Sequence, residues 1–389
     1  MGRIIGHKRY RDILMGFGLL LAASALLLYP EQTTGAMREG LSLCGNVLIP
    51  SLFPFFVLSS LVVELGMSRY LGRLLEPVMR PLFRVNGSCA AALALGFVGG
   101  YPVGARTAIQ LYESGQCSRT EAERLLAFCN NCGPAFILGV VGTGVFGSSR
   151  LGLLLYLVHI LASVMVGLLF RFYKSKDTPT QTVGPHTQFK AIRISVAFTK
   201  SVTDSLYSAF NISAFILFFC VFTRVLTFSG ILEALSTLLA CIFAPLGLTR
   251  VWASHLLSGL LELTYGVSSI TEGALAGRLS MAAFMLGWAG FSVHCQVMAF
   301  LGDSGLSLRT YLVGKLLHGG LSSLLIAILS HFYPLGGAVS VYLAQQTETL
   351  AHLDFHQALT VSAACAWAVW LLFFALVVRI AKKSSRKSL

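Results

Sequence analysis

The chain has 389 residues, of which 55% are hydrophobic and only 12% are charged, and its mean hydropathy is +0.75. Soluble domains carry about 25% charged residues and lack apolar runs of about 20 residues, so the composition indicates a polytopic membrane protein. The formal net charge of +13 does not indicate nucleic-acid binding. Basic residues cluster beside apolar runs, and no basic surface with interleaved aromatic residues is visible.

The apolar runs predict eight membrane spans, each near the ~20 residues needed to cross ~30 Å of hydrocarbon. The predicted spans are 13–29, 44–65, 125–147, 151–171, 206–226, 280–302, 310–330 and 357–378. The first follows four basic residues, as a signal peptide does. Its Ala23-Ser-Ala25 cleavage pattern lies inside the apolar run, so we favour an uncleaved helix over a signal peptide.

Two further segments, 88–112 and 251–276, are apolar but interrupted in the middle by Gly, Pro, Thr or Tyr. Each is predicted to be a re-entrant helical hairpin, which enters the membrane and returns on the same side. Non-helical backbone at membrane depth is tolerated only where protein or a polar cavity supports it. The two turns are therefore candidates for a functional site.

The distribution of basic residues orients these elements. The N-terminal segment, the linker after residue 171 and the C-terminal tail are rich in Lys and Arg, whereas 331–356 contains neither. The positive-inside rule places the first three, and hence both termini, in the cytoplasm and the fourth outside. Eight crossings and two re-entrant hairpins put every one of these segments on its expected side.

The two halves of the chain share an order of features. Each has an amphipathic segment (68–86 and 229–249), a broken hairpin and an interrupted span, and the count of crossings makes the halves antiparallel. We therefore predict an all-α polytopic membrane protein with about eight transmembrane helices and two re-entrant hairpins in two inverted repeats, as in secondary transporters. The predicted regions are the N-terminal membrane helix 1–40, the first repeat 41–172, the basic linker 173–205, the second repeat 206–330, and an outside loop, last helix and tail in 331–389.

The first hairpin carries the residues Gly99, Gly100, Tyr101, Pro102 and Arg106 at its turn. Glycine lets the backbone approach a ligand closely, and proline fixes φ and removes a donor. A buried arginine is costly without a partner and binds carboxylates in a fork, which favours an anionic ligand. The alternative is that the glycines only allow close helix packing and that Arg106 reaches the membrane surface.

In the span 125–147, Asn130 and Asn131 precede Gly133-Pro134. Amide side chains beside a helix break place donors next to free backbone groups. A half-helix beginning near Pro134 would present N–H groups and a positive dipole end to an anion. The alternative is a polar patch that bonds to the neighbouring hairpin.

The second half offers Glu262 and Thr264 in its hairpin, and Ser292 and His294 in its interrupted span. An intramembrane glutamate is a functional candidate by default. Glu262 is a candidate carrier of a coupling proton or Na⁺, and the alternative is an ion pair with Arg106 that holds the hairpins together. His294 is a candidate proton carrier, and the alternative is a packing residue.

No catalytic motif is present, so we predict that the protein is not an enzyme and needs no cofactor beyond a coupling ion. Cys129 and Cys132 have the spacing of a redox or metal pair, but no second pair or histidine cluster completes a site.

The run "GGYPVGARTAIQLYESGQCSRTEAERLLAFCNNCGPAFILGVVGTGVFG" (99–147) resembles the sporulation integral membrane proteins of the YlbJ type. These belong to the wider nucleoside-recognition, or Gate-domain, group, and the later "GFSVHCQV" also fits; the similarity spans about 40–330. The resemblance implies a role in moving dipicolinic acid from the mother cell toward the forespore. It also implies a fold like that of concentrative nucleoside transporters, with two hairpins and two unwound helices at the site.

Together these observations predict a multi-pass transporter of a small organic anion, most specifically dipicolinate, in the mother-cell or outer forespore membrane. Its predicted partners are this anion and the lipid bilayer, and the oligomeric state, a homo-oligomer included, stays open. One alternative is a transporter of nucleosides or nucleobases. Another is a non-transporting membrane scaffold required for spore formation.

Overall fold

The computed structural model describes residues 26–65, 67–177 and 194–332, with isolated positions outside these ranges. Every regular element in these ranges is helical. The elements of the first half are α2 (Pro30–Leu43), the π-helix η1 (Cys44–Leu48), α3 (Ile49–Glu64), α4 (Met67–Phe83), the 3₁₀-helix η2 (Gly87–Cys89), α5 (Ala90–Gly99), α6 (Val103–Glu113), α7 (Arg119–Cys129), the π-helix η3 (Ala135–Val145) and α8 (Ser149–Phe170). Those of the second half are α9 (Ile194–Phe228), α10 (Ile231–Ile242), the 3₁₀-helix η4 (Ala244–Leu246), α11 (Arg250–Leu261), α12 (Leu263–Ser269), α13 (Leu275–Trp288), α14 (Gly290–Leu301) and α15 (Leu308–Phe332).

Four helices of the described part are long and apolar enough to cross a membrane: α8, α9, the broken pair α13–α14 and α15. The bent pair Gly72–Phe83 and Gly87–Gly99 makes a fifth if it counts as one span, and its two parts meet at 93°. The predicted spans 151–171, 206–226, 280–302 and 310–330 coincide with the four helices. Most of the predicted span 13–29 and the whole of the predicted span 357–378 lie outside the ranges described above.

Two predicted spans have a different form in the structure, so the described residues contain fewer continuous spans than expected. The segment 44–65 forms η1 and the 16-residue α3, which contains Pro54. The segment 125–147 is interrupted: α7 ends at Cys129, residues 130–134 are largely non-helical, and η3 follows. Proline lacks an N–H and disfavours helical geometry in the residue before it, which explains a break just ahead of Pro134.

The predicted hairpin 88–112 is a pair of packed helices, α5 and α6, joined at Gly100, Tyr101 and Pro102. Gly100 has a φ of 78°, which favours glycine, and the Tyr101–Pro102 peptide bond is cis. In this hairpin Gly96 faces Gly104, and a Cβ on either residue would collide with the carbonyl oxygen of Cys129. The glycines therefore let the end of α7 pack directly on the hairpin backbone.

The predicted hairpin 251–276 contains α11 and α12, which pack on each other on either side of an extended residue, Glu262. The chain comes close at two glycines here as well, because a Cβ on Gly266 would collide with Gly259. The second interrupted helix breaks between α13 and α14, where Ala289 and Gly290 have φ values of 83° and 82°. This break lies just before the Phe291–Gln296 stretch.

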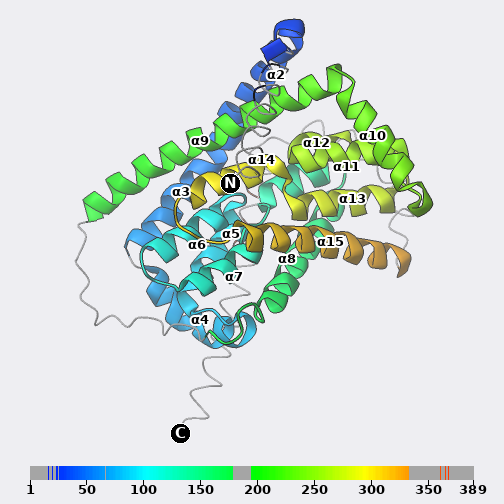
Figure 1. Ribbon diagram of the computed structural model, residues 1–389. Coiled ribbons are helices and arrows are strands. Elements are labelled where there is room, and N and C mark those ends of the chain that lie inside the picture. The colour runs from blue at the N-terminus through cyan, green and yellow to red at the C-terminus, as the bar shows by residue number, and fades with distance from the viewer. Residues whose placement is uncertain are drawn as a thin grey trace, which may run out of the picture.

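Helix α15 packs along several other helices and keeps an exposed apolar face that includes Leu316, Leu324 and Ile328. It runs beside α13 and also packs on α7 and α8, whereas the long α9 crosses one side of the molecule against α2 and α3 (Figure 1). Tyr101 packs against two apolar clusters of buried residues: one is built mainly from α4 to α7 with α14, and the other mainly from η3, α8, α12 and α13. Polar residues on α15 are thereby enclosed by several elements.

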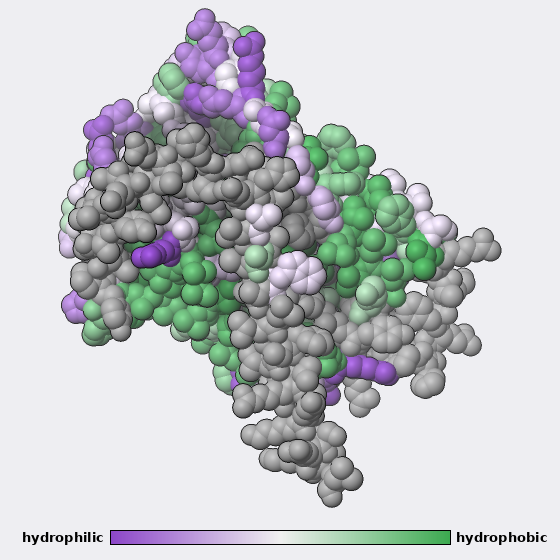
Figure 2. All heavy atoms as spheres, turned by 180° about the vertical axis from the view of Figure 1, so that it is seen from behind, coloured by the Kyte–Doolittle hydropathy of each residue, from purple (hydrophilic) through white to green (hydrophobic). Residues whose placement is uncertain are grey.

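The outer surface is strongly apolar. On the face shown in Figure 2, hydrophobic residues form broad areas, and hydrophilic residues gather mainly at the upper end. Along α9 the exposed large side chains include Phe198, Leu206, Tyr207, Phe210 and Phe218. Soluble monomers rarely expose apolar patches of such extent, so this surface fits contact with lipid and an integral membrane protein.

Candidate functional site

The break after α7 places two asparagines inside the protein. Asn130 and Asn131 are completely buried, and the backbone of Asn130 is extended. Nδ2 of Asn130 donates to Oη of Tyr311 at 3.2 Å, and Nδ2 of Asn131 donates to the carbonyl oxygen of Phe128 at 2.9 Å. Neither Oδ1 atom has a partner in the described part of the chain. Buried polar atoms are normally paired, so these two acceptors mark the break as a candidate ligand site.

Lys315 of α15 lies against the same break and is fully buried. Its Nζ donates to the backbone oxygen of Asn130 at 2.8 Å, to Oη of Tyr101 at 3.0 Å and to Nδ1 of His318 at 3.3 Å. Nζ also lies 4.8 Å from the centre of the Tyr101 ring. No ion pair joins Lys315 to a carboxylate within the described ranges.

The hydrogen bonds of the neighbours define the role of each atom around Nζ. Nε2 of His318 donates to the carbonyl oxygen of His159 at 2.9 Å, so in the neutral ring Nδ1 is an acceptor and faces Lys315. The hydroxyl of Tyr101 donates to the carbonyl oxygen of Leu286 at 2.5 Å, which leaves its oxygen lone pairs for Lys315. The lysine is therefore surrounded by acceptors that carry no formal charge.

Two further histidines border this cluster. Nε2 of His159 accepts from the backbone N–H of Cys132 at 3.0 Å, and the ring lies 4.3 Å from that of His318. Nδ1 of His294 pairs with Oη of Tyr311 at 3.1 Å, and its ring packs edge-on against Trp288. The remaining nitrogens, Nδ1 of His159 and Nε2 of His294, lack partners among the residues described. The cluster thus combines a lone cation with unpaired donors and acceptors.

The structure brings together several residues that the sequence singled out. Tyr101 and Asn130 contact Lys315 directly, and His294 joins the cluster through Tyr311. Gly100 packs against the backbone of Gly133, so the turn of the hairpin touches the break after α7. Gly99 and Pro102 flank Tyr101 in the same turn.

Other candidates lie apart from Lys315 in every contact that the structure records. Arg106 is buried, and its Nη1 donates to the carbonyl oxygen of Phe56 on α3 at 3.5 Å, with the guanidinium 5.2 Å from the Phe56 ring. Glu262 caps α12, because its Oε2 accepts from the N–H of Tyr265 at 2.7 Å. The alternative of an Arg106–Glu262 ion pair is therefore wrong for this conformation.

The last two candidates make only local contacts. The backbone oxygen of Thr264 accepts from the hydroxyl of Ser268 at 2.8 Å, and the hydroxyl of Ser292 accepts from Nε2 of Gln296 at 3.4 Å. Cys129 and Cys132 are free, buried thiols, and no metal-binding group of three or more His, Cys, Asp or Glu side chains occurs in the described part of the chain.

Sequence reasoning missed Lys315, Tyr311, His159 and His318. The signal was present, because a lysine and a histidine at 315 and 318 fall one helical turn apart inside a predicted span. Length and apolar content alone predict the span but do not single out these two residues. A search for ionisable residues in every span would have found Lys315.

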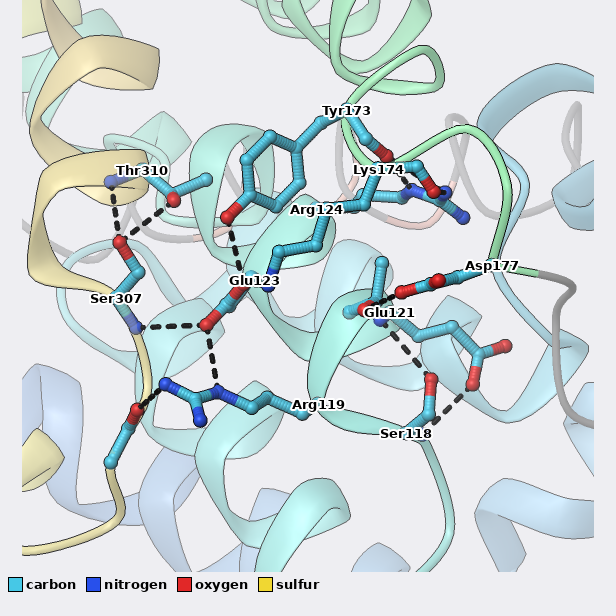
Figure 3. Close-up of polar contacts among 12 residues, drawn as sticks. Ser118, Arg119, Glu121, Glu123, Arg124, Tyr173, Lys174, Asp177, Ser307 and Thr310 are labelled. Carbon is cyan, nitrogen blue, oxygen red and sulfur yellow. Dashed lines mark hydrogen bonds and ion pairs between the residues drawn. The ribbon is translucent and has the colours of Figure 1, made fainter.

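A second polar cluster lies at the N-terminal end of α7, ahead of the break and outside the candidate spans (Figure 3). The Glu123 carboxylate accepts from Nε of Arg119 at 3.0 Å, from Nζ of Lys174 at 2.9 Å and from the hydroxyl of Tyr173 at 3.0 Å. It also accepts from the backbone N–H of Ser307 at 3.3 Å. Burial raises the pKa of Glu123, but these hydrogen bonds lower it by more, so its pKa lies below the usual value. The same contact raises the pKa of Lys174.

Neighbouring side chains of α7 bond to the loop after α4 and the loop after α8. Arg124 donates to the backbone oxygens of Arg84, Tyr173 and Lys174. Thr120 donates to Asp177 at 2.6 Å. Since these bonds reach the loop after α4, the loop after α8 and the start of α15, this end of α7 acts as a structural junction.

Comparisons with known proteins agree with the sequence resemblance. Residues 47–170 match the family described as Gate, nucleoside recognition. The chain is 33% identical over 340 residues to the sporulation integral membrane protein YlbJ of Bacillus subtilis (strain 168), and the match covers 83% of each chain. Two solved structures of CNTnw variants are also similar. The outward-facing one has a TM-score of 0.42 and 15% identity, with 82% of this chain and 86% of that chain covered. The one in an intermediate state has a TM-score of 0.41 and 15% identity, with 84% and 86% covered.

Proposed function

The chain belongs to the family of the sporulation integral membrane protein YlbJ, and from this premise we propose that it transports a small organic anion across the membrane. We propose dipicolinate as that anion, because the resemblance of residues 99–147 to the sporulation family implies movement of this acid toward the forespore. The corresponding location is the mother-cell or outer forespore membrane, with both chain ends in the cytoplasm. The proposed partners are the anion and the surrounding lipid.

The observation that carries the proposal is the solitary charge of Lys315. A buried ammonium without a counter-ion is costly, and an ionisable side chain inside a membrane span marks a substrate or ion pathway by default. Here the lysine sits where the α5–α6 turn meets the break after α7, and its protein neighbours supply only neutral acceptors. A carboxylate of the substrate would supply the missing negative charge.

The surrounding groups suit a planar aromatic acid. Nε2 of His294 has no partner among the described residues, and it carries the ring N–H in the tautomer in which the Tyr311 hydroxyl donates to Nδ1. We propose that this N–H bonds a second carboxylate and that the ring of Tyr101 stacks on the substrate. Gly100 keeps the turn narrow beside Gly133, which leaves backbone rather than side chains at that point. Arg106 belongs to a separate contact with α3, where we propose that it attracts the anion at longer range.

We further propose that the two halves are inverted repeats that move by alternating access. In each half an amphipathic helix, a glycine-packed hairpin, an interrupted helix and a long helix follow in this order: α4, α5–α6, α7–η3 and α8, then α10, α11–α12, α13–α14 and α15. Lys315 and Asn130 belong to opposite halves and meet at their contact. Substrate sites of transporters built from inverted repeats lie where the repeats meet.

A nucleoside or nucleobase is the second candidate substrate. The Oδ1 atoms of Asn130 and Asn131 are unpaired acceptors, and they would complement the N–H donors of a base edge. The Gate match, which is described as nucleoside recognition, favours the same class. A neutral base would leave the charge of Lys315 uncompensated, so we place the anion first.

Binding to the purified protein in lipid nanodiscs distinguishes these candidates. Isothermal titration with dipicolinate, isophthalate, uridine and adenosine should give the tightest binding for dipicolinate. Lys315→Met should remove that binding, whereas Lys174→Met, at a lysine outside the spans, should leave it intact. Nucleoside binding that survives Lys315→Met would support the second candidate. Absence of binding to all four compounds, in protein that retains its thermal transition, would favour a non-transporting scaffold.

A further inference from the structure

The environment of Lys315 is built to receive a proton. An ammonium group has three N–H donors, and Nζ has three hydrogen-bond partners, which are the Asn130 carbonyl oxygen, Oη of Tyr101 and Nδ1 of His318. Two of these acceptors are held in place by bonds of their own, because Tyr101 donates to Leu286 and His318 donates to His159. The protonated lysine therefore finds a complete and fixed set of acceptors.

Among the described residues, the same environment holds no charge that compensates the proton. The titratable groups around Nζ, from its own helix and from the elements packed on it, are Tyr101, Cys129, Cys132, His159, His294, Tyr311 and His318. On α13, which runs beside α15, Arg278 donates to the carbonyl oxygen of Ile270 instead. None of these groups is a carboxylate. A proton on Nζ thus adds a net positive charge to the interior.

We infer that a proton and the substrate anion bind cooperatively at Lys315, which makes the protein a proton–anion symporter. The proton on Nζ and the carboxylate that faces it compensate each other, so the pair adds no net charge at Lys315. Linkage makes the effect reciprocal, because a proton on Nζ tightens anion binding by the same factor by which the anion tightens proton binding. This inference rests on the proposed function, because it assigns the coupling ion to the site proposed for the anion.

The proton step balances without any further reactant. On the loading side the Nζ lone pair takes a proton from hydronium, so an N–H bond forms, an O–H bond breaks and water remains. On the releasing side the anion departs first, the uncompensated ammonium gives its proton to water, and the neutral amine returns. His318 is a positioning residue in this step, since its Nδ1 orients one N–H of the ammonium and its Nε2 is engaged with His159.

Proton uptake during binding is a direct test with the wild-type protein. Titrations of dipicolinate in buffers of different ionisation enthalpy should show up to one proton taken up per anion bound. The affinity should tighten as the pH falls, by up to about tenfold per pH unit where a full proton is taken up. Lys315→Arg carries a guanidinium that stays charged at every accessible pH, so it should bind the anion without proton uptake and without this pH dependence.

Transport in proteoliposomes tests whether a proton gradient drives accumulation of the anion. In the wild type a pH gradient should drive dipicolinate above equilibrium and a Na⁺ gradient should not, whereas Lys315→Arg should only equilibrate it. Anion binding with no proton uptake, or accumulation driven by Na⁺ alone, would overturn the symport and leave anion transport standing. Failure of the wild type to bind any anion would instead remove the proposed function itself. If Lys315→Arg does not fold, proton uptake by the wild type and its accumulation of dipicolinate under each of the two gradients still test the symport.

Discussion

The two ends of α7 hold two polar clusters with opposite electrostatic designs. At the N-terminal end, the buried carboxylate of Glu123 meets Arg119 and Lys174, and a tyrosine hydroxyl completes its shell. At the C-terminal end, the acceptors that the buried Lys315 meets in the described part of the chain are all neutral. The short helix α7 therefore connects the Glu123 cluster, whose charges are compensated, to the Lys315 cluster, whose charge is not compensated.

This difference separates structural roles from functional ones. Compensated charges tie three loops to α7, and no buried side-chain atom of Glu123 or Arg124 lacks a partner in the described part of the chain. The cluster around Lys315 leaves unpaired atoms on Asn130, Asn131 and His294. Unpaired buried atoms cost stability unless another molecule uses them. The comparison thus predicts that substitutions at one end change stability, whereas substitutions at the other change binding.

The largest expected effect is on anion binding by Lys315→Met. Methionine has a similar length without the charge, and loss of a buried charged partner costs about 2–5 kcal/mol in binding, so dipicolinate affinity should fall by at least about 30-fold. The melting temperature in nanodiscs should change little, because the loss of a donor to three buried acceptors offsets the removal of a group that has no counter-ion when it is protonated. A large fall in melting temperature with unchanged affinity would reverse the roles that we assign to the two clusters.

The next effect is on stability, through Glu123→Ala. This change leaves Arg119, Lys174, Tyr173 and Ser307 without their shared acceptor, and breaking a buried charge pair costs about 3–5 kcal/mol, of which the partly exposed partners recover a share through water. The purified variant should therefore unfold at a lower denaturant concentration than the wild type. Dipicolinate affinity should stay within about twofold, because the effects of well-separated sites are independent. Glu113→Ala, at an exposed position on α6, is the matched control.

A smaller effect is expected on the pH dependence of stability, because the contacts of Glu123 should weaken in acid. The pKa of Glu123 is lower in the folded protein than in the unfolded chain, so its contribution is present above the unfolded pKa. It is lost as the pH falls through the folded pKa, because the protonated carboxyl group no longer holds Lys174 and Arg119 as ions. Melting temperatures measured from neutral to acidic pH should decline less steeply for Glu123→Gln than for the wild type. Identical slopes would mean that these contacts do not set the ionisation of Glu123.

The sequence contained the backbone features of the site but not its central charge. Glycine and proline at 96–104 and 130–134 indicated the hairpin turn and the helix break, because both residue types have strong local conformational preferences. The partners of Lys315 could not be read in this way. Its contact with Tyr101 joins residues 214 positions apart, and such a pairing depends on how α15 packs between α7, α8 and α13. The start of α9 at Ile194 was likewise not predicted, because the predicted span begins at residue 206. The first turns of α9 contain polar residues, and one of these, Lys200, forms an ion pair with Glu64 of α3 at 2.7 Å.

The smallest expected effect concerns Arg106, the cation that the sequence made most prominent. Its guanidinium bonds to α3 through Phe56 and lies in the field of Asp204 on α9, so its charge is partly compensated. Arg106→Lys keeps the charge and should change dipicolinate affinity by less than about threefold, as expected for an effect through long-range attraction alone. Arg106→Met should lower the rate of anion association more than it raises the rate of dissociation, because remote charges steer encounter. Stopped-flow binding separates the two rates. A rise in dissociation as large as that of Lys315→Met would place Arg106 in direct contact with the anion, and the anion site would then extend to α3.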